Sequence, residues 1–411
     1  MSGHAKLAPS SAHRWMRCPG SVALEAACPE AASEYAAEGT AAHALAAMAL
    51  TDGSDAAAYL GCVIQVNGSD LEVTDDMAGH VQKYLDYVRA IGGALMVEQR
   101  LSIEAVTDEP GATGTPDAVI VAGDELVIAD LKYGRGVRVN ADRNPQLAIY
   151  ALAALDELGF MGDFERVRLA IVQPRLDHVS EWVCGAQELR AMHVNTIAPR
   201  AEIALQFINR SPADVWVDDL APGDEQCRFC RAQASCPALT GHVLATVADD
   251  FVDVTRPVAP QIAHAAERTF DNATLANLLG AVDLIEAWCR AIRAKAESEL
   301  LAGRPVPGFK LVEGRRGARR WANEAEAEAA MKSMRLKPEQ MYNMALISPT
   351  AAEKLHNAGT IGPRQWAKLQ GLITQSDGKP SVAPESDKRP PLAIQATADE
   401  FSDVSNHGGS V

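Results

Sequence analysis

Five side chains that suit metal-dependent chemistry lie close together in the middle of this 411-residue chain. Asp117 ends a Gly-Thr-Pro-Asp stretch, Asp130 and Lys132 are two residues apart, and Gln146 precedes Tyr150 by four residues. Carboxylates are the ligands that Mg²⁺ or Mn²⁺ prefers, and such a metal polarises a phosphodiester and activates water. A lysine can position that water or stabilise charge in the transition state. The order acid, acid, lysine therefore predicts metal-dependent cleavage of phosphodiesters.

An alternation of strands and helices would bring these residues together. After helices at 33–50 and 75–91, we expect three strands, a helix, two strands and a long helix, at 95–103, 117–121, 125–132, 144–158, 166–173, 179–183 and 186–209. Asp130 and Lys132 then share one strand face, and pairing of the neighbouring strand brings Asp117 to the same edge. Gln146 and Tyr150 share one helix face. The pattern predicts an α/β sandwich with a mixed sheet flanked by helices.

Two further residues are candidates for the same site. His43 lies on the first of these predicted helices. A site that includes its neutral imidazole would prefer Mn²⁺ more than an all-oxygen site would. Glu98, on the polar face of the first strand, is a weaker candidate. Each part taken alone is more often structural or solvated, but the ordered combination is far more specific than any part.

Four cysteines form a second group with metal-binding spacing. Cys227, Cys230 and Cys236 place three thiols within ten residues, and Cys18 is the best candidate for the fourth ligand. Four thiolates suit either zinc or an iron–sulfur cluster, and zinc has the higher base rate. The spacing by itself does not distinguish zinc from an iron–sulfur cluster. The alternative to both is that the three clustered cysteines bind no metal.

Composition limits the partners and the location of the chain. A net charge of −16 repels nucleic acid at long range, so any contact with DNA must be local, through metal ions and a few basic side chains. The chain has no apolar run of membrane-spanning length and no apolar core of a secretory signal at its start. We therefore expect a cytoplasmic protein without a membrane partner.

Together these motifs resemble a known nuclease family. They are a histidine, a Gly-x-x-Asp, an Asp-Leu-Lys, a Gln-x-x-x-Tyr and a split set of cysteines: His43, residues 114–117, 130–132 and 146–150, Cys18, Cys227, Cys230 and Cys236. Their order resembles the RecB-type branch of the PD-(D/E)XK nuclease superfamily. The one-plus-three cysteine pattern is similar to that of its iron–sulfur members, the AddB-type helicase-nuclease and the exonuclease of CRISPR adaptation. Residues 10–21 and 38–43 further resemble a phage and prophage family of this type, and the resemblance covers residues 8–240.

The resemblance implies a fold and a set of residue roles. It implies a restriction-endonuclease-like PD-(D/E)XK core in which His43, Asp117, Asp130 and the main-chain carbonyl of Leu131 bind Mg²⁺ or Mn²⁺. Lys132 would be the catalytic lysine. Gln146 and Tyr150 would support the site and the DNA. Cys18, Cys227, Cys230 and Cys236 would hold a [4Fe–4S] cluster, which favours iron–sulfur over zinc.

The expected organisation is a nuclease domain at 1–245 with its iron–sulfur clamp, a helical C-terminal region at 258–371 and a disordered tail at 375–411. The expected function is that of a metal-dependent deoxyribonuclease, an exonuclease on single-stranded DNA ends that works with phage replication or recombination proteins. The rival hypotheses are a catalytically inactive DNA-binding accessory protein with the same fold, and a zinc-stabilised interaction protein.

Overall fold

The chain was analysed as a computed structural model, and it divides into two compact units, Met1–Glu313 and Gly314–Val411. The structure describes residues 5–28, 34–66, 68–247, 272–310, 329, 332–333 and 348–373. The predicted disordered tail at 375–411 lies outside the described residues, as does much of the predicted helical region at 258–371.

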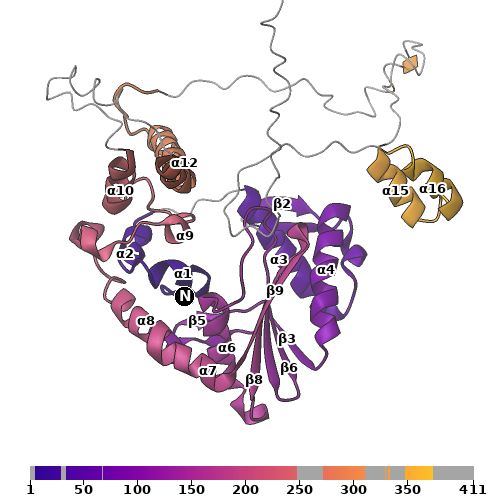
Figure 1. Cartoon of the computed structure of the whole chain (residues 1–411), viewed down its shortest axis with the longest axis horizontal. Coiled ribbons are helices and arrows are strands. Elements are labelled where there is room, and N and C mark those ends of the chain that lie inside the picture. The colour runs from indigo at the N-terminus through magenta and orange to yellow at the C-terminus, as the bar shows by residue number, and fades with distance from the viewer. Residues whose placement is uncertain are drawn as a thin grey trace, which may run out of the picture. The chain divides into compact units, whose positions relative to one another are not determined.

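A five-stranded sheet lies at the centre of the first unit, with helices before, between and after its strands (Figure 1). The elements that lead to the last strand of this sheet are α1 (Ala12–Trp15), α2 (Ser21–Ala26), α3 (Glu34–Asp52), β1 (Val63–Val66), β2 (Ser69–Glu72), α4 (Asp75–Ile91), β3 (Ala94–Val97), β4 (Leu101–Ser102), α5 (Glu104–Thr107), β5 (Thr113–Gly114), β6 (Ala118–Ala122), β7 (Glu125–Leu131), α6 (Pro145–Glu157), β8 (Arg166–Gln173) and β9 (His178–Gly185). The helices that follow are α7 (Ala186–Met192), α8 (Ala198–Leu205), α9 (Asp224–Cys227), α10 (Pro237–Val247) and α12 (Asn272–Leu301).

The main sheet has the strand order β3-β6-β7-β8-β9. β7 and β8 run parallel, and the other neighbouring pairs are antiparallel. The parallel pair requires a crossover, and α6 supplies it. The predicted α/β architecture with a mixed sheet flanked by helices is therefore confirmed.

The two faces of the sheet are covered by different helices, which Figure 1 shows on opposite sides. Side chains alternate along a strand, so every second residue of β7 enters the core on the same side. Val127 and Ala129 pack with residues of α3 and α4, whereas Leu126 and Ile128 pack with residues of α6. All seven residues of β7 are buried, as expected for the central strand of the sheet.

Several predicted elements differ from the observed ones. The strand expected at 95–103 is wrong as a single element, because β3 ends at Val97 and Glu98 adopts a positive φ of 49°. This turn breaks the alternating pattern and redirects the chain into the short pair β4–β5. The long helix expected at 186–209 is interrupted by a π-helical turn at His193–Ile197. A hairpin of β1 and β2 lies between α3 and α4, where no strand was expected.

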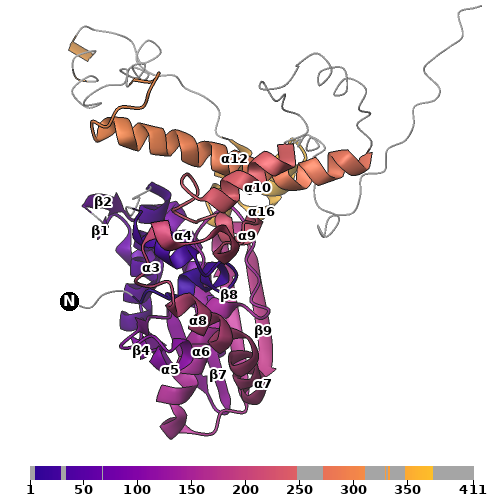
Figure 2. The ribbon, with the colours of Figure 1, turned by 90° about the vertical axis from the view of Figure 1, so that its left-hand side faces the viewer.

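The first unit extends beyond residue 245, the expected end of its domain. α12 packs against α10 and α9, and its buried Leu284 joins a cluster that contains Cys18, Cys227 and Cys236. Figure 2 shows α12 and α10 beside α9. None of the described helices is both long and apolar enough to cross a membrane.

In the second unit, two short helices pack against each other, α15 (Pro349–Asn357) and α16 (Pro363–Gln370). Trp366 of α16 is buried, and its ring stacks on His356 with a centroid distance of 5.3 Å. The C-terminal part is therefore helical where the structure describes it.

Candidate active site

Asp130, Lys132 and Gln146 form a connected polar triangle at the end of β7. The Nζ of Lys132 lies 2.9 Å from Oδ2 of Asp130 and donates a hydrogen bond of 3.0 Å to Oε1 of Gln146. The amide Nε2 of Gln146 donates in turn to Oδ1 of Asp130 at 2.7 Å. Gln146 therefore holds the acid and the lysine at the same time.

The start of α6 is what brings Gln146 over the strand end. Asn144 caps the helix, with its side-chain oxygen accepting from the main-chain N–H of Leu147 at 3.3 Å. Pro145 follows in the first helical position, which its fixed φ suits. These two residues begin the helix one position before Gln146, so its amide lies in the first turn.

Asp117 precedes β6 and is held from two sides. Its Oδ1 lies 2.9 Å from Nδ1 of His43, and its Oδ2 accepts the main-chain N–H of Leu131 at 2.7 Å. The pairing of Ala118 with Ala129 across β6 and β7 makes the second contact possible. Residues 43, 117, 130 and 132, far apart in sequence, therefore converge at one edge of the sheet. The observed contact of Leu131 with the site is the hydrogen bond from its main-chain N–H to Asp117. The metal-binding role of its main-chain carbonyl remains what the family resemblance implies.

Glu98 and Tyr150 lie at the border of this group. The main-chain N–H of Glu98 donates to the carbonyl of Asp117 at 3.1 Å, so the turn after β3 is tied to the site. Tyr150, one helical turn beyond Gln146, is buried against Gly114, where an added Cβ would lie 2.8 Å from its ring. A glycine at position 114 is what lets this ring pack beside the site.

The electrostatics of the site are those of a buried acid, Asp130, close to a half-buried one, Asp117. Burial raises the pKa of Asp130, opposed by Lys132 and supported by the charge of Asp117. Burial would lower the pKa of Lys132, but the charge and hydrogen bond of Asp130 outweigh it and raise that pKa, so the amine stays protonated. Partial desolvation, followed by the charge of Asp117, raises the pKa of Glu98. Close carboxylates destabilise one another, and a divalent cation would relieve this repulsion.

His43 and Tyr150 are also perturbed. Burial would lower the pKa of His43, but the hydrogen bond and charge of Asp117 outweigh it and raise that pKa. Burial, followed by the charges of Asp130 and Asp117, raises the pKa of Tyr150, so its phenol remains protonated and able to donate.

These donors fit Mg²⁺ or Mn²⁺ in chemical kind, since two carboxylates and an imidazole meet at one edge. In the conformation described, however, they satisfy one another through hydrogen bonds. Within the described ranges, no group of three or more His, Cys, Asp or Glu side chains is placed so that it could hold a metal ion. Side chains would therefore have to reorient before they could bind one.

The four cysteines of the predicted metal-binding group line one cavity. Cys18, Cys227, Cys230 and Cys236 all line it, and its empty volume, part of it open to solvent, is about 330 Å³. Main-chain N–H groups donate to three of the sulfur atoms, each at 3.4 Å: Ala221 to Cys18, Gly223 to Cys227 and Leu239 to Cys236. Such donors stabilise thiolates and tune metal clusters. The structure therefore brings together the cysteines that 208 residues separate in sequence.

Without a metal, three of these cysteines favour the protonated thiol. Burial is the largest cause of a raised pKa at Cys18 and Cys227, and it raises the pKa of Cys230 to about 12. A metal or a cluster would compensate by binding the deprotonated form. The donor set fits such a group in chemical kind, but, as with the acids, these described cysteines are not placed to hold a metal without reorienting.

Residues that the sequence did not single out hold the cysteine segment in place. Glu25 of α2, 8% exposed, accepts from Nε of Arg14 and from the main-chain N–H of Arg231, both at 2.8 Å. The side chain of Gln233, also buried, donates to the main-chain carbonyls of Cys227 and Arg228. Glu25 contacts two arginines that are distant from one another in sequence. No spacing rule connects positions 14, 25 and 231, so no signal for these contacts was present in the sequence.

Gly20 packs closely against residues 215–220, which precede the cysteine segment. Replacing Gly20 should destabilise this packing. An added Cβ would lie 2.9 Å from the main-chain oxygen of Asp219 and 2.8 Å from Val215. We expect Gly20→Ala to lower the free energy of unfolding by about 1–3 kcal/mol, as overpacking does, measured by urea denaturation. Gly79→Ala is the matched control, because nothing lies within 4 Å of its added Cβ on α4. That control should gain about 0.5–1 kcal/mol, and equal behaviour of the two variants would contradict the expected clash.

A family model described as "Protein of unknown function (DUF2800)" matches residues 4–390. The chain belongs to this family. The match spans both units, so the sheet, the cysteine cavity and the C-terminal helices all fall within the family region. Among solved structures, one titled "Crystal structure of SSO0001" is 17% identical over 40% of this chain and 70% of that chain, with a TM-score of 0.19. A TM-score this low carries no argument about fold or function.

Proposed function

We propose that this DUF2800 member is a metal-dependent deoxyribonuclease with a PD-(D/E)XK core, acting on single-stranded DNA ends in phage or prophage replication or recombination. One observation carries the proposal. His43 and Asp117 meet Asp130, Lys132 and Gln146 at one edge of the sheet, and two carboxylates, an imidazole and a lysine are the side chains that metal-dependent phosphodiester hydrolysis uses. The choice of DNA ends over internal sites, and of phage metabolism, rests on the family resemblance of the motifs.

The residues have separate roles in this mechanism. Asp117, Asp130 and His43 would hold Mg²⁺ or Mn²⁺, which supplies Lewis-acid polarisation of the phosphodiester when bound. Lys132, kept protonated by Asp130, places a positive charge where negative charge develops on the phosphorus oxygens. Gln146 hydrogen-bonds both Asp130 and Lys132 and so keeps the acid and the amine side by side at the end of β7, from where Asp130 would turn to bind the cation.

The cysteine cavity would hold a [4Fe–4S] cluster. The four thiols that line the cavity are the donors that either a cluster or zinc uses, and the choice of the cluster over zinc rests on the family resemblance of the one-plus-three cysteine pattern. Cys18 comes from the start of the chain and the other three from residues 227–236, so the cluster would tie both ends of the sheet domain together. Its role is then structural, and zinc remains the alternative.

The test is an assay of anaerobically purified protein on DNA labelled at the 5′ or the 3′ end. We expect cleavage with Mn²⁺ or Mg²⁺ and none with EDTA, and we expect single-stranded DNA to be cut faster than a blunt duplex. Shortening from one end only would support exonuclease action and give its polarity. A protein that binds DNA and retains its cluster but cuts nothing with either metal would favour the inactive accessory protein.

A further inference from the structure

A half-buried ion pair lies next to the strand end that carries the candidate active site and has no role in the mechanism above. Arg175, in the turn after β8, forms two hydrogen bonds of 2.8 Å to the carboxylate of Glu38 on α3. The Arg175 side chain is 8% exposed, and a weaker contact of 3.4 Å reaches Asp76 on α4. Two-point pairing of this kind fixes both side chains more firmly than a single contact does.

The same guanidinium stacks on the segment that follows Lys132. The Cζ of Arg175 lies 4.3 Å from the centroid of the Tyr133 ring, and Tyr133 is 3% exposed. The Nε of Arg175 and the hydroxyl of Tyr133 have no hydrogen-bond partner among the described residues. The contact between them is therefore made by the ring face, as a cation–π interaction.

Arg175 thus connects the elements that carry the candidate metal ligands. Glu38 lies five residues before His43 on α3, while Tyr133 directly follows Lys132. The turn of Arg175 is itself tied to this strand end, because the N–H of Lys132 donates to the carbonyl of Val172 at 2.9 Å. A shift of α3 relative to β7 would separate His43 from Asp130.

We propose that Arg175 is a positioning residue that fixes α3 against the end of β7 through Glu38 and Tyr133, and so sets the affinity of the site for a divalent cation. The inference rests on the proposed function, since it takes His43 and Asp130 to be ligands of that cation. Residues that hydrogen-bond metal ligands typically change metal affinity by 10–100-fold when replaced, and because Arg175 contacts Glu38 and Tyr133 and not a ligand, we expect an effect at the lower end of that range.

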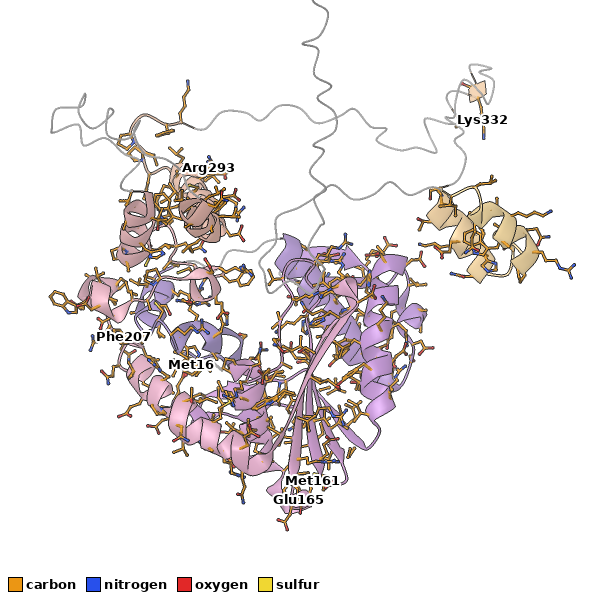
Figure 3. The ribbon with its side chains drawn as sticks, viewed as in Figure 1. Met16, Met161, Glu165, Phe207, Arg293 and Lys332 are labelled. Atoms are coloured by element: carbon orange, nitrogen blue, oxygen red, sulfur yellow. The ribbon has the colours of Figure 1, made fainter. Side chains whose placement is uncertain are left out.

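The test compares two ion pairs of the same kind in the full chain. Glu38→Gln removes the charge opposite Arg175 and preserves the shape of the side chain. The control is Glu125→Gln, because Glu125 also pairs with an arginine: the Nη2 of Arg168 donates to both of its carboxylate oxygens, at 3.2 and 3.0 Å. That pair lies at the other end of β7, where Glu125 is opposite Arg166, next to the Glu165 labelled in Figure 3. Free Mn²⁺ is measured by EPR during titration, and stability by urea denaturation.

We expect Glu38→Gln to raise the Mn²⁺ dissociation constant about tenfold. Glu125→Gln should lose stability to a similar degree with wild-type Mn²⁺ affinity. Arg175→Lys, which keeps the charge but loses the two-point pairing and the planar stack, should weaken Mn²⁺ binding as well and covers the case in which Glu38→Gln does not fold. Wild-type affinity in both Glu38→Gln and Arg175→Lys, or an equal loss in Glu125→Gln, would overturn the inference.

The same titration separates this inference from the proposed function. If wild-type protein binds no Mn²⁺, the proposed metal site is wrong and the role of Arg175 is wrong with it. If wild-type protein binds Mn²⁺ through Asp130, shown by loss of binding in Asp130→Asn, and the Arg175 and Glu38 variants bind equally well, only the positioning role is wrong.

Discussion

Asp130→Asn should abolish DNA cleavage, with a fall in rate of about 10³-fold or more. The carboxylate is buried at the end of β7 and has one oxygen next to Lys132 and the other bonded to Gln146. An amide preserves its size but cannot supply the negative charge that a divalent cation needs. Cleavage of end-labelled single-stranded DNA in Mn²⁺ measures the effect, and Mn²⁺ binding should be lost in parallel.

Lys132→Ala should have an equally large effect on cleavage for a different reason. It removes the charge that stabilises the transition state but leaves both carboxylates, so Mn²⁺ binding should persist while cleavage is lost. This split between binding and cleavage separates the ligand role of Asp130 from the role of Lys132.

Asp124→Asn is the control for both variants. Asp124 lies in the turn between β6 and β7, at the opposite end of the strand, and its exposed side chain contacts Arg166 at 3.8 Å. Its activity should equal that of the wild type. Full cleavage by Asp130→Asn, or by Lys132→Ala, would remove these residues from the mechanism.

Cys227→Ser should remove the proposed cluster and destabilise the domain. The protein as purified should contain about four iron and four sulfide atoms per chain and absorb visible light, and the variant should lose both. Metal binding to a site that forms only on folding contributes to folding free energy. A loss of about 3 kcal/mol would lower the melting temperature by about 6–12 °C in a domain of this size.

Cys62→Ser controls for the loss of a thiol. Cys62 is free and exposed, just before β1, and does not line the cysteine cavity. It should retain iron, colour and stability. A colourless wild-type protein with one zinc per chain would replace the cluster by the zinc alternative, whereas metal-free protein with unchanged stability in Cys227→Ser would exclude both.

The sequence predicted the local parts of the fold because local rules decide them. α4 begins at Asp75 and ends at Ile91 as expected, since Thr74 caps it and Gly92 follows with a positive φ. The apolar run of β7 likewise predicted a buried strand. The strand expected at 95–103 was wrong because its alternation continued through Glu98, although the chain turns there.

The sequence by itself determined which side chains are suited to metal chemistry and how they are spaced: an acid, an acid and a lysine, and one plus three cysteines. Only the tertiary structure decided that Asp117 meets His43, because 73 residues and the fold of α3 onto the sheet lie between them. The roles of Arg175 and Glu25 also come from the tertiary structure alone. A buried ion pair between distant segments leaves no periodic pattern in sequence, since its partners are set by how layers pack and not by the spacing of neighbours along the chain.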